Sequence, residues 1–165
     1  MSLDARVYCN CIETGKFITP HPFPDRLFIS EQGSPELESE DLEELILHDR
    51  WLASSVCQHK DCLLASHWLG NIALIALFRT IVTQLVGHVE DRCLLLWSKV
   101  IYNGTHTGDY LTAEQVNELD AEIRYLRSCE LTGLDGENGQ YFQDFLGKLE
   151  DLIRTSQQVN KPIAF

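Results

Sequence analysis

The chain has 165 residues, 44% of them hydrophobic, which is enough apolar material for one domain with a core of its own. Its 13 basic and 25 acidic residues give a formal net charge of -12, which argues against direct binding of nucleic acid, because the phosphates would be repelled. The six cysteines are too sparse for a small disulfide scaffold and the N-terminus shows no signal-peptide pattern, so we expect reduced thiols in a cytoplasmic protein.

The N-terminal part predicts two strands separated by a long loop. Residues 4–12, DARVYCNCI, alternate between apolar and polar positions, as in a half-buried strand. Three prolines and a glycine then interrupt regular structure in residues 14–25, and residues 26–30, RLFIS, offer a short second strand. Together the two strands could make a hairpin.

Two helices are predicted between residues 34 and 87. Ser34 or Ser39 can cap the first, and the acidic residues that follow are favoured near the positive end of the helix dipole. Residues 68–87 are the most apolar segment, and their length alone would suit a membrane span. However, Arg79 and nearby polar residues gather on one side of this helix. We therefore expect a mostly buried central helix in a soluble domain, without membrane association.

The C-terminal part predicts two more helices. Residues 92–102 form an apolar run that fits a strand or a helix, and we favour a helical start followed by extended chain near Val100. Thr112 and Gln115 match a capping box that opens an amphipathic helix. Residues 141–159 predict another such helix, and the closing residues 160–165 could add an edge strand.

These elements predict an α+β fold in a single domain spanning residues 1–165. A small, mostly antiparallel sheet would combine the N-terminal strand, RLFIS, the chain near residues 99–102 and the C-terminal IAF. About four helices would pack against this sheet.

One group of residues has the chemistry of a zinc site. Cys57, His59, Cys62 and His67 lie within one short stretch, and thiolate and imidazole are ligands that zinc prefers. Their crowding into one segment differs from the usual arrangement of two distant pairs, although Cys9 and Cys11 could supply distant ligands. The alternatives are that these are small buried thiols that only pack, or that a cysteine acts as a nucleophile beside a histidine.

A second group lies in the loop YNGTHTGD, before the predicted helix at Thr112. Glycine and asparagine explain a turn, but a turn does not require a histidine, which titrates near neutral pH. The loop could hold a small ligand or substrate, or it could serve only to turn the chain. The residues of this candidate ligand-binding site are Tyr102, Asn103, Thr105, His106 and Asp109.

The remaining sequence signals favour a binding protein over an enzyme. The motifs G-x-S-x-G, G-x-x-x-x-G-K-[ST] and G-x-G-x-x-G are absent, so the common hydrolase, nucleotide and dinucleotide signatures are missing. A strongly acidic surface suits recognition of a basic protein partner, or simple solubility.

Four segments, LDARVYCNCIETGK, LGNIALIALFR, SKVIYNGTHTGDYL and KPIAF, together resemble a family of small uncharacterised bacterial proteins. The resemblance implies no established activity, cofactor or catalytic residue. The small, acidic, cytosolic character is similar to that of many bacterial immunity proteins. By that analogy we expect a protein-binding function, such as an immunity-type inhibitor of a basic partner.

Overall fold

The computed structural model describes residues 2–102, 109–129 and 136–165. These residues form five α-helices, a four-stranded antiparallel sheet and a separate two-stranded sheet, which confirms the predicted α+β fold. In chain order the elements are β1 (Ser2–Tyr8), β2 (Leu27–Ile29), β3 (Pro35–Leu37), α1 (Leu42–Leu52), β4 (Leu63–Asn71), α2 (Ile72–Val86), α3 (Val89–Arg92), β5 (Tyr110–Leu111), α4 (Ala113–Ser128), α5 (Glu137–Val159) and β6 (Ile163–Ala164).

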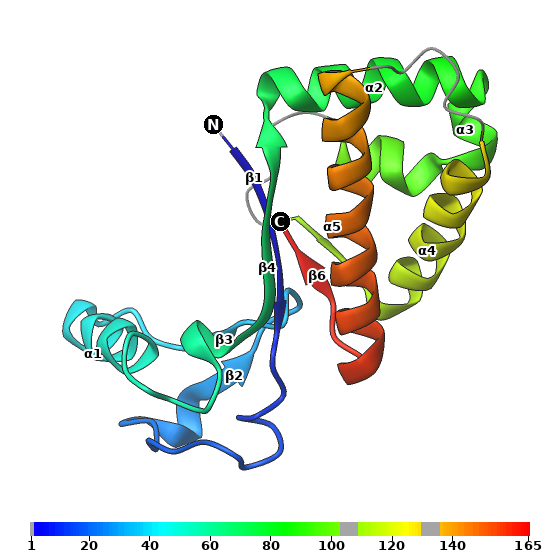
Figure 1. The fold of residues 1–165 in the computed structure, drawn as a ribbon. Coiled ribbons are helices and arrows are strands. Elements are labelled where there is room, and N and C mark those ends of the chain that lie inside the picture. The colour runs from blue at the N-terminus through cyan, green and yellow to red at the C-terminus, as the bar shows by residue number, and fades with distance from the viewer. Residues whose placement is uncertain (1, 103–108, 130–135) are drawn as a thin grey trace.

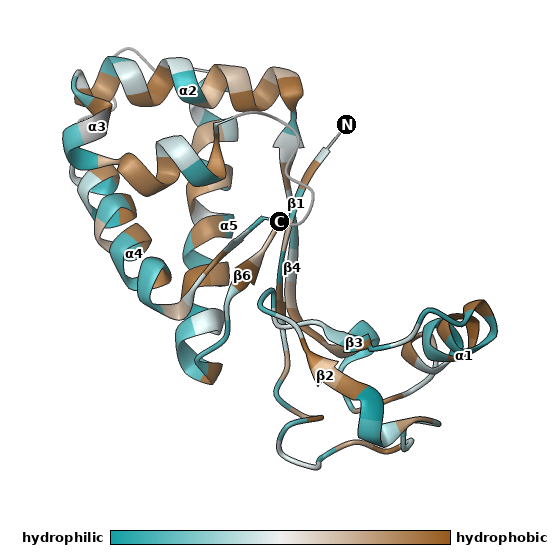
Figure 2. Ribbon diagram, turned by 180° about the vertical axis from the view of Figure 1, so that it is seen from behind, coloured by the Kyte–Doolittle hydropathy of each residue, from teal (hydrophilic) through white to brown (hydrophobic). Residues whose placement is uncertain are grey.

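The described chain forms two lobes joined by the long antiparallel pair β1 and β4 (Figure 1). The small lobe, residues 9–62, contains β2, β3 and α1, and the large lobe contains α2 to α5 with the rest of the four-stranded sheet. Each lobe has its own cluster of buried side chains. Hydrophobic and hydrophilic residues alternate along α4 and α5 in Figure 2, as expected of helices with one buried side.

The core of the large lobe lies between the sheet and its helices. Leu3, Ala5 and Val7 on one face of β1 are fully buried, which confirms the alternation read from the sequence. On the helical side, Phe145 of α5 stacks on Phe78 of α2 with ring centres 4.4 Å apart. This apolar packing between distant parts of the chain fixes the helices on the sheet.

The two C-terminal helices are confirmed. The Thr112 hydroxyl accepts the N–H of Gln115, while the Gln115 side chain accepts the N–H of Thr112, so α4 starts with the predicted capping box. Helix α5 begins at Glu137, a turn earlier than residues 141–159 indicated. The C-terminal strand β6 also forms, but it pairs with β1 on one side and β5 on the other, so it is not an edge strand.

The expected strand near Val100 is wrong. This part of the chain is helical and includes a π-helical turn at Leu96–Val100. Two distant side chains hold it: Glu122 accepts the N–H of Leu95 at 2.9 Å, and Arg79 donates to the carbonyl of Ile101 at 2.8 Å. Because both partners come from other helices, the apolar run itself could not reveal this conformation.

The segment RLFIS forms a strand, β2, but in a different sheet from the one expected. It pairs with β3, across a turn in which Gly33 adopts a left-handed φ of 85°. The first helix therefore starts after this hairpin, with Asp41 as its N-cap, and not at Ser34.

The apolar segment 68–87 is divided between two elements. Strand β4 continues to Asn71, whose side chain accepts the N–H groups of Ala73 and Leu74 and so starts α2. Helix α2 buries only four of its residues and borders the large lobe, which corrects the expected central position. None of the helices that the structure describes is both long and apolar enough to cross a membrane.

The small lobe contains a buried pair of histidines beside Trp51. The N–H of Phe23 donates to His21 Nδ1 at 2.9 Å, so that nitrogen carries no proton. The other ring nitrogen, Nε2, must then donate to His48 Nδ1, which lies 3.0 Å away. His21 is therefore neutral, and a proton added to its Nδ1 would remove the acceptor for the N–H of Phe23.

We predict that the small lobe loses stability in mild acid. Burial, and then the neighbouring His48, lowers the pKa of His21 below its usual value, so the unfolded chain binds more protons than the folded one. The stability that His21 contributes is therefore fully present above about pH 6.5 and falls as the pH drops below that value. Urea unfolding at several pH values measures this dependence. His21→Asn, which keeps an acceptor for Phe23, should reduce the slope between roughly pH 5 and 7, whereas His88→Asn should leave it unchanged.

Candidate metal centre

Four donor atoms converge in the small lobe, on Cys9, Cys11, Cys57 and His59, and all lie within 4.8 Å of one another. The Sγ atoms of Cys9 and Cys57 are 3.7 Å apart. His59 Nδ1 is 3.3 Å from the Cys11 sulfur and 3.7 Å from the Cys57 sulfur. Around a tetrahedral zinc ion, two sulfurs bonded at ~2.3 Å would lie about 3.8 Å apart, and a sulfur and a nitrogen slightly closer. These three separations are therefore compatible with a metal ion held by three cysteines and one histidine.

The pairing of β1 with β4 brings the two halves of the cluster together. Near the small lobe, Val7 pairs with Ala65 and Tyr8 with Leu63, with a bulge between them. The backbone continues this pairing beyond the strands, because the N–H of Cys9 donates to the carbonyl of Cys62 at 2.7 Å. The C-x-C pair at the end of β1 therefore meets the loop that precedes β4.

Local backbone geometry orients the second half of the cluster. The N–H of His59 donates to the Cys57 sulfur at 3.4 Å, and the Gln58 amide lies 3.4 Å from the outer ring nitrogen of His59. Both contacts are of the kind that orient metal ligands. Asp61 and Cys62 then adopt left-handed φ values of 54° and 57°, which cost about 1–3 kcal/mol each in residues other than glycine. Such strain persists where the surroundings hold the loop firmly.

The thiols of the cluster are buried. Cys9, Cys11 and Cys57 are each about 5% exposed or less. Desolvation by burial raises the pKa of Cys9 and of Cys11, and burial followed by the neighbouring Cys57 raises the pKa of Cys62 to about 12. A divalent cation at the centre would stabilise thiolates there and displace their protons.

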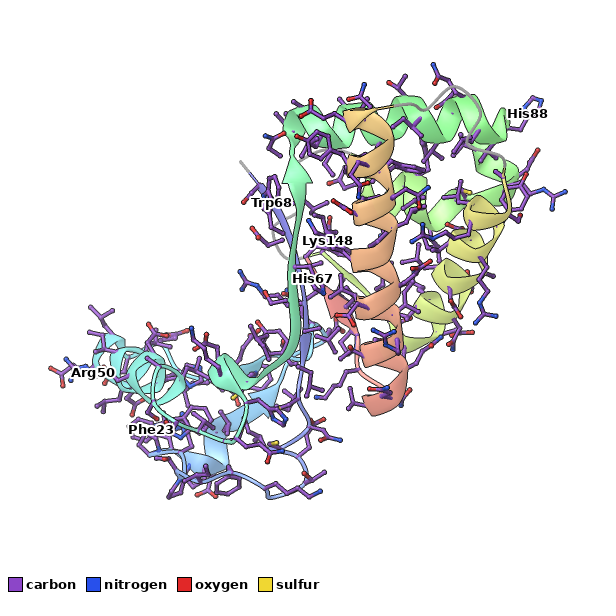
Figure 3. All side chains as sticks on the ribbon, viewed as in Figure 1. Phe23, Arg50, His67, Trp68, His88 and Lys148 are labelled. Carbon is purple, nitrogen blue, oxygen red and sulfur yellow. The ribbon has the colours of Figure 1, made fainter. Side chains whose placement is uncertain are left out.

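The structure separates the four predicted zinc ligands. Cys57 and His59 belong to the cluster, and Cys62 lies in the same small core, beside the Cys57 thiol. His67 does not, because it sits on β4 and its Nε2 lies 2.7 Å from a carboxylate oxygen of Asp151 on α5 (Figure 3).

Cys9 and Cys11 complete the cluster. The sequence pattern placed them on the buried face of a strand and named them only as possible distant ligands. Their strand face is buried, as the alternation indicated, and four of the six buried residues in the core that receives them are cysteines. The signal that could have identified them is the pair of patterns C-x-C and C-x-H, each of which places two donors side by side.

Only two residues of the predicted loop site, Tyr102 and Asp109, belong to the part of the chain that the structure describes. Asn103, Thr105 and His106 lie outside the described residues. Tyr102 is 42% exposed and its carbonyl accepts from Arg79, while the Asp109 carbonyl accepts the N–H of Phe165. The described backbone at both ends of the loop is thus tied to the large lobe.

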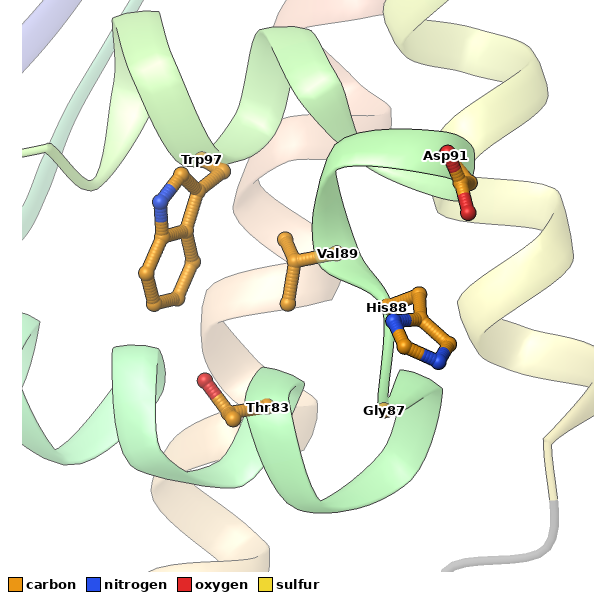
Figure 4. Close-up of a pocket in the computed structure, with 6 residues that line it drawn as sticks. All are labelled: Thr83, Gly87, His88, Val89, Asp91 and Trp97. Atoms are coloured by element: carbon orange, nitrogen blue, oxygen red, sulfur yellow. The ribbon is translucent and has the colours of Figure 1, made fainter.

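A hollow of about 360 Å³ lies between the end of α2 and α3. Figure 4 shows Trp97 on one side of this hollow and His88 with Asp91 on the other. The Arg79 guanidinium covers the Trp97 ring at 3.7 Å. One imidazole and one carboxylate are too few donors for a closed metal site, so the Cys/His cluster remains the stronger candidate.

Comparisons of the chain with protein-family models, curated proteins and solved structures find no match. The resemblance to a family of small bacterial proteins therefore stays a prediction, and function must be argued from the site itself.

Cobalt(II) can replace zinc at such sites and report its ligands by absorption. We predict three bound thiolates, so Cys11→Ser should lower the sulfur-to-cobalt charge-transfer intensity by about one third. His59→Ala should keep that intensity but shift the visible bands, and Cys62→Ser should change neither. The prediction would be contradicted if Cys62→Ser lowered the charge-transfer intensity as much as Cys11→Ser did, and His59→Ala left the whole spectrum unchanged. Cys62 would then be the fourth ligand in place of His59.

Proposed function

We propose that this protein is a zinc-binding protein whose metal has a structural role, holding the small lobe together. The observation that carries the proposal is the convergence of Cys9, Cys11, Cys57 and His59 at separations that suit tetrahedral zinc. Zinc would link the end of β1 to the loop before β4, two segments far apart in the sequence.

The composition of the small core supports a metal cross-link. Its buried residues are Trp51, Val56 and four cysteines, and five apolar side chains pack around them in partly buried positions: Tyr8, Ile12, Leu27, Leu52 and Leu64. A core of this size contributes limited stability, and small domains often add a metal to it. The bound ion would supplement these apolar contacts with bonds to four side chains.

The arrangement supports a structural role more than a catalytic one. Four protein donors fill the tetrahedral positions of zinc, whereas a catalytic zinc keeps one position for water or substrate. The three thiols are buried, and only His59 of the four ligands is partly exposed. This site therefore offers no open position for a reaction.

Elemental analysis of protein purified without chelator tests the proposal. The wild type should carry one zinc per chain, and Cys57→Ala should carry none. Cys93→Ala is the matched control, because it removes an equally buried thiol from the core of the large lobe and should retain the metal. Chelation should lower the wild-type Tm by roughly 5 °C or more, since each 1 kcal/mol shifts a chain of this size by about 2–4 °C. The proposal would be refuted if wild-type protein purified without chelator contained no zinc and its Tm did not change when chelator was added.

A second candidate function is recognition of a basic protein partner, which the outer surface of the small lobe favours. Leu42 is 70% exposed, and Ile46 and Leu47 on α1 and Phe28 on β2 are each more than 40% exposed. Of these, Phe28 lines a groove of about 760 Å³, together with an acidic rim of Glu38, Glu40 and Asp41 and with Arg26, whose charge is paired with Glu44. Exposed apolar side chains on the same lobe as an acidic rim suit a partner that is basic and amphipathic.

Neutralising this rim should abolish binding of such a partner. In pull-downs, wild-type bait should retain basic proteins that elute as salt rises, and a variant with Glu38→Gln, Glu40→Gln and Asp41→Asn, in which asparagine can still cap α1, should lose them. The control removes the same charge elsewhere, through Glu114→Gln, Glu118→Gln and Glu137→Gln, and should still bind. Recovery that resists salt, or equal loss in both variants, would argue against recognition by this surface.

A further inference from the structure

The large lobe contains a hollow that neither the metal nor the acidic groove explains. It has a volume of about 700 Å³ and lies where the end of β4, the first turns of α2 and one side of α5 meet. This volume is within the range of sites that bind small molecules. The hollow is built entirely from described residues of the large lobe and is independent of the metal cluster.

The interior of this hollow is apolar, and two exposed aromatic rings border it. Leu69, Leu74 and Phe78 are among the residues that form its wall. Trp68 is 46% exposed and Tyr141 is 43% exposed, although aromatic side chains of this size are usually covered. Solvent-exposed aromatic rings beside an apolar hollow are suited to contact with a flat, apolar part of a ligand.

Trp68 faces outward by the regular alternation of β4, on the same face as the exposed Ser66. A bulge follows it: Asp4 pairs with Trp68 but Leu3 pairs with Gly70, so Leu69 is an extra residue on the β4 side. Leu69 and Gly70 are consequently both buried. The exposed Trp68 ring therefore stands next to the buried Leu69, and both line the hollow.

The charges around the hollow favour an anionic group. Lys148 lies between α5 and β4 (Figure 3), where its Nζ donates to the Trp68 carbonyl at 2.7 Å and lies 5.4 Å from the centre of the Trp68 ring. That single hydrogen bond leaves two of its three donors for a ligand. The start of α2 at Asn71 adds the positive end of a helix dipole. One carboxylate, Asp144, opposes these two sources and already accepts from Gln140 at 2.8 Å.

From these observations we infer that the large lobe binds a small organic anion with a flat apolar body, such as an aromatic carboxylate, in the hollow between Trp68, Tyr141 and Lys148. The body of the ligand packs on the apolar wall and the Trp68 ring, and its carboxylate accepts hydrogen bonds from Lys148. A complete second copy of this chain is a weaker fit to the same hollow, because a surface of net charge -12 would bring further acidic groups towards Asp144.

A matched series of probes tests the inference on the full chain. The probes are 2-naphthoate, the neutral 2-naphthamide and the cationic 2-naphthylmethylammonium, which share one body and differ in charge. Two-dimensional ¹H–¹⁵N NMR follows the indole N–H of Trp68. We expect 2-naphthoate to produce a saturable shift at Trp68 and to bind roughly tenfold more tightly than the amide, as one charge-assisted hydrogen bond would provide. The cation should bind most weakly.

Three substitutions assign the binding to named side chains. Lys148→Gln should weaken 2-naphthoate to the level of the amide and leave the amide unchanged. Asp144→Asn removes the opposing charge and should strengthen binding of the anion. Phe17→Ala, which removes a similarly exposed ring from the small lobe, is the control and should have no effect.

Several results would overturn the inference. These are the absence of a saturable shift at Trp68 with any probe, equal affinity for the three charge states, or preference for the cation. Shifts at Trp68 that depend on protein concentration instead of probe concentration would also overturn it, because they would show that the exposed rings form a contact between copies of the chain.

Discussion

The antiparallel register of β1 and β4 is the constraint on which the rest of the molecule depends. At one end, this pair presents the buried face of Leu3, Ala5 and Val7 to the helices of the large lobe. At the other end, it delivers Cys9 next to Cys62 and so closes the small lobe. A slip of one residue would turn the apolar face outward and separate the sulfur atoms at the same time. One set of backbone hydrogen bonds therefore determines both the main core and the candidate metal centre.

The fold could be predicted where the signal is local. The alternation in β1, the capping box at Thr112 and the apolar stripe of α5 each depend on residues close in sequence, and all three are confirmed. The strand expected near Val100 failed because its conformation depends on Glu122 and Arg79, which belong to other helices. Periodicity describes which face of a segment is apolar, but it does not report hydrogen bonds that arrive from elsewhere in the fold.

The candidate site shows the same division between local and distant information. Cys57 and His59 could be named as donors from their chemistry and proximity, but Cys62 and His67 were grouped with them for the same reason. The register of β1 and β4 brings Cys9 and Cys11 to Cys57 and His59, and the packing of α5 on β4 pairs His67 with Asp151 instead. A buried cysteine on a strand face also looks identical to a small apolar core residue in the sequence, so its role depends on which side chains surround it.

The position of β6 has a consequence for how the chain folds. This two-residue strand lies between β1 and β5, and the neighbouring Lys161 is almost completely buried and pairs with Glu13 of the small lobe at 2.5 Å. Strands β1 and β6 are separated in the sequence by nearly all of the other described elements, so their pairing closes a very long loop of chain. Because contacts of such high sequence separation form slowly, we expect the step that places β6 between its neighbours, and ties it to both lobes, to come late in folding.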